Sequence, residues 1–212
     1  MMRRLFWMLA VAAATAACGR PGGHDSSALP YYESADFTPR WAPVAHRVGA
    51  FELTTQMDRR VTETDLRGRI HVASFIFTSC PSICPTLVQQ LRRVQDATRD
   101  ADVLLVSYSV TPAIDTPARL AEFGRERGID PARWWLVTGE AGQIATLARR
   151  SYFADDTRLE EASGRERSSQ VLHTEKLLLV DGQGRLRGVY NGTVPLDIDR
   201  LIGDVRILAR PV

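Results

Sequence analysis

Three apolar runs, each followed by a segment of helical periodicity, dominate the middle of this chain. Branched and aromatic side chains fill the runs, which indicates strands buried on both faces of a sheet. The predicted strands are residues 70–77 (IHVASFIF), 103–109 (VLLVSYS) and 134–138 (WWLVT). Strands that alternate with helices run parallel through right-handed crossovers, so the pattern favours an α/β fold.

The segments between and after these runs are predicted to be helices. Apolar residues recur at helical spacing over about residues 83–99. Thr116 followed by Pro117 combines a capping residue with proline at the first helical position, so a second helix begins there. A third helix is predicted over residues 141–150, and a last one begins at Pro195.

The C-terminal third predicts an antiparallel addition to the sheet. Two strands, residues 176–180 and 186–190, flank the turn DGQG (181–184), which is a strong hairpin signal. A further short strand is predicted over residues 51–55, before a turn at 57–60. The whole pattern predicts a three-layer α/β sandwich with a thioredoxin-like arrangement, in which a mostly parallel central sheet carries an antiparallel hairpin at one side.

The N-terminus predicts export and attachment to a membrane. Arg3 and Arg4 precede an apolar stretch that is too short to span a membrane comfortably and that ends in small residues. Residues 1–17 are therefore predicted to be a lipoprotein-type signal peptide. Cys18 follows directly and resembles the cysteine of a bacterial lipobox, although Thr15 stands where leucine is usual. A lipid on Cys18 would hold the domain at a membrane surface without crossing it.

Composition agrees with one folded domain behind this leader. The chain has 212 residues, of which 44% are hydrophobic, and this is enough for an ordinary core. Its 27 basic and 25 acidic residues nearly cancel and are interspersed, so nothing favours nucleic acid as a partner. Residues 18–43 are rich in glycine and proline and predict a flexible tether, and the domain then covers residues 44–212.

Cys80 and Cys84 lie in FIFTSCPSICP (75–85), between a predicted buried strand and a predicted helix. Sites in open α/β sheets form beyond the carboxyl ends of strands, and a helix start favours a thiolate, so we expect both thiols to be more acidic than a free cysteine. Residues four apart there lie on one face, so the sulfurs can bind one soft ion such as Cu(I) or form a disulfide. So short a disulfide loop would stabilise the fold little. The alternative, two buried cysteines acting as small apolar residues, is disfavoured by this placement.

Two sulfurs leave a copper ion under-ligated, and four histidines could supply a third donor. His24 lies in the predicted tether and His46 near its end, where exposure to solvent is expected. His71 lies inside the first buried strand and is predicted to be a packed, hydrogen-bonded core residue. His173 precedes the first hairpin strand, which in a thioredoxin-like sheet lies next to the cysteine-bearing strand. His173 is therefore the histidine best placed to complete a site of two sulfurs and one nitrogen.

Three stretches together resemble the Sco/SenC family: FIFTSCPSICP, SVTPAIDTP (109–117), and the histidine ahead of LLLVDGQGRLRGVYNG (177–192). The resemblance covers about residues 44–210 and implies a thioredoxin-fold copper protein needed to build the binuclear copper centre of cytochrome c oxidase. It implies that Cys80, Cys84 and His173 bind one copper ion and that the two cysteines form a redox pair. The implied partners are a copper donor protein and the copper-bearing oxidase subunit, and the implied location is the bacterial cell envelope, with the domain facing the periplasm or the exterior.

Two positions depart from the pattern of the family. Thr111 follows Ser-Val, and Leu172 precedes the histidine, where acidic residues are common. Neither change removes a ligand, although both can alter the hydrogen bonds that orient ligands. The predicted function is a copper metallochaperone, and the alternative is a thiol–disulfide reductase that keeps the copper-ligand cysteines of the oxidase reduced. A peroxide-reducing enzyme on the same fold ranks last, because of the close CxxxC pair and its histidine.

Overall fold

The computed structural model of the chain describes residues 29–79, 83–154 and 174–210. Seven strands of this part form one sheet in the order β2-β1-β5-β4-β3-β6-β7. The strands are β1 (Glu52–Thr55), β2 (Arg60–Thr62), β3 (Ile70–Ile76), β4 (Val103–Ser109), β5 (Trp134–Thr138), β6 (Lys176–Val180) and β7 (Leu186–Asn191). The helical elements are η1 (Glu63–Leu66), α1 (Ile83–Ala97), α2 (Pro117–Glu126), α3 (Ala141–Thr146), η2 (Leu147–Ser151) and α5 (Pro195–Leu208).

The sheet has a parallel centre with an antiparallel hairpin on each side. β3, β4 and β5 run parallel, and β3 pairs with β4 from Ile70↔Val103 to Ile76↔Ser109. β6 lies antiparallel to β3 and begins the β6–β7 hairpin, as predicted. β1 and β2 form a second hairpin, and β1 pairs antiparallel with β5. The α/β class and the β6–β7 hairpin are confirmed, and the structure adds a second antiparallel hairpin, β1–β2, at the other side of the sheet.

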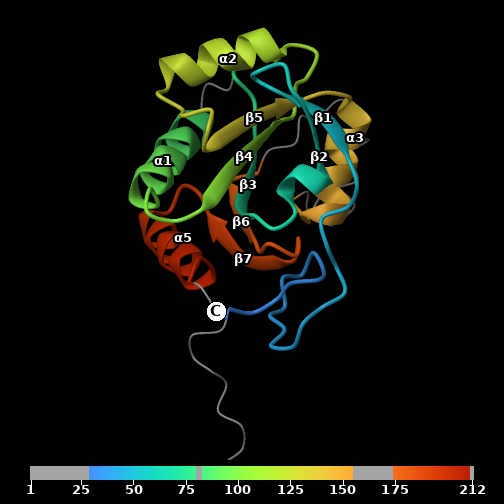
Figure 1. Cartoon of the computed structure of the whole chain (residues 1–212), viewed down its shortest axis with the longest axis vertical. Coiled ribbons are helices and arrows are strands. Elements are labelled where there is room, and N and C mark those ends of the chain that lie inside the picture. Colours follow the sequence, from blue (N-terminus) through green and yellow to red (C-terminus); the bar gives the residue numbers. More distant parts are fainter. Residues whose placement is uncertain (1–28, 80–82, 155–173, 211–212) are drawn as a thin grey trace, which may run out of the picture.

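Helices cover both faces of the sheet and make the three predicted layers (Figure 1). One core lies between the sheet and helices α1, α2 and α5, and it includes the fully buried Leu87, Leu120 and Leu201. The second core lies under η1, α3 and η2, and it includes Ile144 and the residues of β3 that point the other way. Alternate residues of β3 therefore face different cores, which explains why its sequence is mostly apolar on both faces.

Local sequence explains where α2 and α3 begin, but it does not predict where α3 ends. The Thr116 hydroxyl accepts a hydrogen bond from Arg119 N at 3.3 Å, and Pro117 opens α2, as predicted. The helix expected over residues 141–150 begins with Glu140 as its cap, but α3 ends at Thr146 and the chain continues as the π-helix η2. This wider turn is followed by Tyr152, whose side chain is fully buried.

A buried polar chain joins η2 to the sheet. His71 Nε2 lies 3.1 Å from the Tyr152 hydroxyl oxygen, which lies 3.0 Å from the Tyr108 hydroxyl oxygen. Burial lowers the pKa of His71 to about 4 and raises the pKa of both tyrosines. The prediction of a packed, hydrogen-bonded His71 is confirmed. The prediction that His46 is exposed was wrong, because the residue is half-buried and its Nε2 lies 2.9 Å from the Ser151 carbonyl oxygen.

The segment from residue 29 to residue 40 lies along β7. Tyr32 forms an antiparallel bridge with Leu186, and its amide donates to the Leu186 carbonyl at 3.0 Å. The buried Arg187 donates to the carbonyl oxygens of Leu29 and Pro30 and stacks on the Tyr31 ring, 4.0 Å from its centroid. These contacts attach the segment close to the β6–β7 turn.

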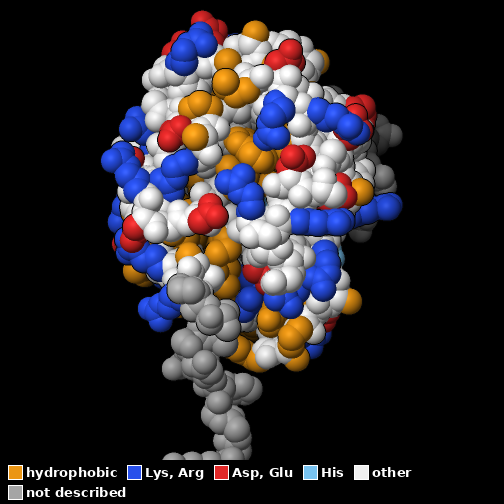
Figure 2. Space-filling model, in the orientation of Figure 1, with side chains coloured by type: hydrophobic (Ala, Val, Ile, Leu, Met, Phe, Trp, Pro, Cys, Tyr) orange, Lys and Arg blue, Asp and Glu red, His pale blue; other side chains and the backbone are white. Residues whose placement is uncertain are grey.

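The surface in Figure 2 carries basic and acidic side chains side by side, as the nearly equal numbers of the two in the sequence lead one to expect. Ion pairs such as Arg92–Asp96 and Arg119–Glu122 account for part of this mixture. Within the described ranges, every helix is too short or too polar to cross a bilayer.

Candidate functional site

The carboxyl ends of the parallel strands meet at one edge of the sheet. The amide of Val110 donates to the carbonyl of Ile76 at 2.9 Å, so the chain leaves β3 and β4 side by side. The described chain continues from β3 to Ser79 and resumes at Ile83 with α1. β6 is antiparallel to β3 and begins at this same edge. This edge is where ligands bind in open α/β sheets.

Cys84 is the second residue of α1 and is 5% exposed. The amides of a first helical turn point away from the helix body without intrahelical partners, and they favour negative charge such as a thiolate. Leu87 and Val88, in the next turn, are buried against the sheet and fix the start of the helix. Cys84 therefore occupies the strand-to-helix position that the sequence predicts.

The other predicted site residues lie outside the described residues. These are Cys80, His173 and the lipidation candidate Cys18. Their roles stay predictions, as do the boundaries of the signal peptide and tether. Across residues 29–79, 83–154 and 174–210, no three side chains of His, Cys, Asp or Glu cluster closely enough to bind a metal ion.

Asp115 organises the chain that leads from β3 to Cys80. Its side chain is fully buried beside the ends of β3 and β4. Asp115 Oδ1 accepts from the Thr78 hydroxyl at 2.5 Å, and Oδ2 accepts from the Thr78 amide at 3.2 Å. Oδ2 also accepts from the hydroxyls of Ser109, at 2.6 Å, and Thr111, at 3.0 Å. Thr111, one of the two positions expected to depart from the family pattern, is thus a donor to this carboxylate.

Gly192 allows the β7–α5 connection to pack closely against the chain beside the site. The Gly192 amide donates to the Glu175 carbonyl at 2.7 Å, so the β7–α5 connection packs on the chain that enters β6. A Cβ at position 192 would lie 2.2 Å from Leu87 Cδ1 and 2.9 Å from the Glu175 carbonyl oxygen. Only glycine permits this approach, which holds α1 and the start of β6 together.

Sequence reasoning missed Asp115 as a structural centre. It recognised SVTPAIDTP only as part of a resemblance and assigned no contact to the carboxylate. The available signal was an acidic residue close behind a buried strand, preceded by hydroxyl residues and followed by a helix cap. That signal does not identify Thr78 as the partner, because 37 positions separate the two residues.

Comparison with known proteins identifies the family. The SCO1/SenC family profile matches residues 41–210. The chain belongs to the SCO1/SenC family. A relative from Stutzerimonas stutzeri, named for copper binding, is 30% identical over 158 residues, which cover 73% of this chain and 74% of that protein.

Solved structures agree with membership of the SCO1/SenC family. A SCO1/SenC family lipoprotein from Bacillus anthracis is 27% identical with a TM-score of 0.68, and the match covers 79% of this chain and 98% of that one. BsSco, described as a member of the Sco family of cytochrome c oxidase assembly proteins with a disulfide switch, is 27% identical with a TM-score of 0.66 and covers 79% and 96%. The thioredoxin-like fold predicted from the sequence is therefore confirmed.

Proposed function

We propose that this SCO1/SenC protein is a metallochaperone that binds one copper ion through Cys80, Cys84 and His173. It delivers the ion to the copper-bearing subunit of a cytochrome c oxidase. The observation that carries the proposal is the position of Cys84, in the first turn of α1 at the carboxyl edge of the sheet. The copper-binding name of the S. stutzeri relative supports the cargo, and the description of BsSco supports the client.

The donor set suits copper that must be passed on. Thiolates are soft ligands that select Cu(I), and imidazole completes a three-coordinate site. Ser79, the last described residue before Cys80, and Thr174, the first described residue after His173, both adjoin the edge where β3 ends and β6 begins. A site at a sheet edge is open to the ligands of a partner, so copper can move from a donor protein to this chain and on to the client by ligand exchange.

A thiol–disulfide reductase is the second candidate, favoured by the disulfide switch described for BsSco. One thiolate of the Cys80–Cys84 pair attacks a client disulfide and forms a mixed disulfide, and the other cysteine then displaces the client thiol. The client gains two electrons and two protons, and this chain keeps the disulfide. A second thiol-bearing protein must reduce that disulfide before the next cycle.

The protein is proposed to work at a membrane of the bacterial cell envelope, facing the periplasm or the exterior. The signal-like residues 1–17 and Cys18 support lipid attachment, and the B. anthracis neighbour is itself called a lipoprotein. Cys18→Ser should leave the protein in the soluble fraction, whereas the wild type sediments with membranes and takes up labelled fatty acid. Equal labelling of both proteins would contradict an anchor at Cys18.

Metal analysis with X-ray absorption on the reduced domain tests the copper site. We expect one copper per chain with two sulfur neighbours and one nitrogen neighbour. His173→Ala should weaken copper binding while the Cys80–Cys84 disulfide still forms. The matched control is His46→Ala, because His46 contacts Ser151 and Phe153 and should not alter the copper content. Full copper affinity in His173→Ala would refute this ligand set.

Complementation of a null strain separates the two candidate functions. If His173→Ala restores oxidase assembly although it binds copper poorly, the reductase role is favoured over the metallochaperone role. If Cys80→Ser and Cys84→Ser each restore assembly, both roles are wrong.

A further inference from the structure

Asp115 is a buried acidic group that the proposed copper chemistry does not use. Within the described part of the chain, its carboxylate is compensated by hydroxyl and amide donors, and no Arg or Lys side chain forms an ion pair with it. A buried charge is costly unless hydrogen bonds satisfy it, so these donors must keep their positions for Asp115 to remain there.

The donors come from both strands that end at the site. Thr78 follows β3 and lies two residues before Cys80, Ser109 is the last residue of β4, and Thr111 begins the β4–α2 connection. Thr78 is the only one of the three on the cysteine-bearing segment, and it makes two bonds to the carboxylate. The carboxylate therefore ties the segment before Cys80 to the neighbouring strand.

We propose that Asp115 is a positioning residue that sets the copper affinity and the disulfide equilibrium of the cysteine pair. Its carboxylate fixes Thr78, and through Thr78 the start of the loop that carries Cys80. The inference rests on the proposed function for its copper part. It also applies to the reductase alternative, because both depend on where the first cysteine is held relative to Cys84.

Loss of this anchor should cost preorganisation at both sulfurs. Outer-shell groups that orient ligands typically change metal affinity about 10-fold to 100-fold when removed. A looser loop also lowers the effective concentration of one thiol at the other, which favours the dithiol over the disulfide. Asp115→Ala should therefore raise the copper dissociation constant about tenfold and reduce the disulfide fraction in a fixed glutathione buffer.

Three variants test the route through Thr78. Asp115→Asn should recover most of the affinity, because the amide oxygen can face the Thr78 amide while its NH₂ faces the Thr78 hydroxyl, which can rotate to accept. Thr78→Val keeps the shape and removes only the hydroxyl bond, so it should show a smaller loss in the same direction. In the Asp115→Ala background, Thr78→Val should add little, because both changes remove the same contact.

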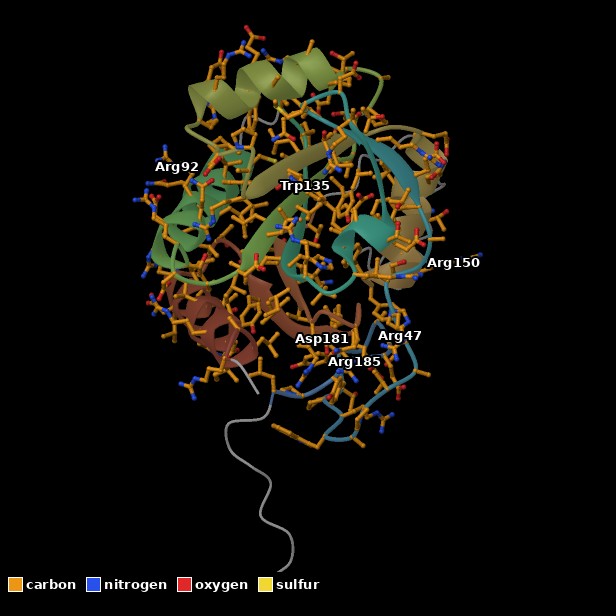
Figure 3. The ribbon with its side chains drawn as sticks, viewed as in Figure 1. Arg47, Arg92, Trp135, Arg150, Asp181 and Arg185 are labelled. Carbon is orange, nitrogen blue, oxygen red and sulfur yellow. The ribbon has the colours of Figure 1, made fainter. Side chains whose placement is uncertain are left out.

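A matched control lies at the other end of the same sheet. Asp181 is also a buried carboxylate that orders a turn, and it lies 2.8 Å from Arg185 (Figure 3). It also forms an ion pair with Arg187 at 3.2 Å. Asp181→Ala should lower the melting temperature and leave the copper dissociation constant and the disulfide equilibrium unchanged. This control separates positioning at the site from general loss of stability.

Competition with a chromogenic Cu(I) chelator and equilibration with glutathione give two independent measurements on the folded proteins. If Asp115→Ala melts earlier but keeps wild-type copper affinity and disulfide equilibrium, the positioning role is wrong. If Asp115→Ala does not fold, an unchanged Thr78→Val overturns it instead. If the wild type binds no copper, the metallochaperone proposal fails, and the glutathione equilibrium alone still decides the role of Asp115.

Discussion

His71 should make the stability of this domain depend on pH in a defined window. Its pKa falls from 6.5 to about 4 because the ring is completely buried. Above pH 6.5 the ring is neutral in both folded and unfolded chains and contributes no pH dependence. As the pH falls from 6.5 to about 4, His71 binds a proton in the unfolded chain but stays neutral in the folded chain. The free energy of unfolding therefore decreases. Below about 4 both states are protonated and the loss stops growing.

The size of this effect follows from the shift. At about 1.4 kcal/mol per pKa unit, the change from 6.5 to about 4 corresponds to a loss of about 3 kcal/mol. That is a large part of the stability of an ordinary domain, which is about 5–15 kcal/mol. Urea unfolding of the reduced, copper-free domain at intervals from pH 7.5 to pH 4 measures it.

The variant His71→Leu removes the titrating ring and isolates its contribution. Acidic side chains that titrate in the same range contribute equally to both proteins, so the difference between the two curves belongs to His71. Tyr152→Phe is the control, because it removes the 3.1 Å contact while the ring stays buried, and its curve should follow the wild type. Parallel curves for wild type and His71→Leu between pH 6.5 and 4 would refute the argument.

Three further results are expected. Gly192→Ala should lower the free energy of unfolding by about 1–3 kcal/mol, measured by urea titration, because its Cβ meets the Glu175 carbonyl; an unchanged midpoint would contradict this. Arg187→Met breaks a buried ion pair, so it should lower the free energy of unfolding by about 3 kcal/mol and speed hydrogen exchange at the Tyr32 amide. Unchanged slow exchange there would show that Arg187 does not hold this segment on β7. Copper affinity should fall as the pH drops, because protons compete for the thiolates and imidazole, and a flat titration would count against these ligands.

Most of the fold could be predicted because its strands and helix starts have clear signals in the local sequence. The buried strands β3, β4 and β5 are mostly apolar runs, and Thr116-Pro117 marks the start of α2. Periodicity does not report how a turn is hydrogen-bonded, so the change from α3 to the π-helix η2 was not predictable. Nor does it say what covers a strand edge, and the pairing of Tyr32 with Leu186 depends on residues far apart in the chain.

In the candidate site, too, local sequence predicted some features and missed the contacts between distant residues. The position of Cys84 followed from a strand, a loop and a helix that are consecutive in sequence. The Thr78–Asp115 contact did not, because it forms only when parallel strands bring their ends together. His46 was expected to be exposed because its segment is rich in loop residues. Contacts with Ser151 and Phe153, which are distant in sequence, cover its ring instead.

The contact between Arg187 and residues 29–30 determines at which end of the domain the N-terminal segment is attached. Arg187 lies at the start of β7, beside the amino end of β3, whereas Cys84 lies beyond the carboxyl end of β3. Any pull on the N-terminal side of Leu29 therefore acts on the end of the domain remote from Cys84. A domain held at Leu29 would turn the end that carries Cys84 away from its support, toward a large protein that approaches from the other side.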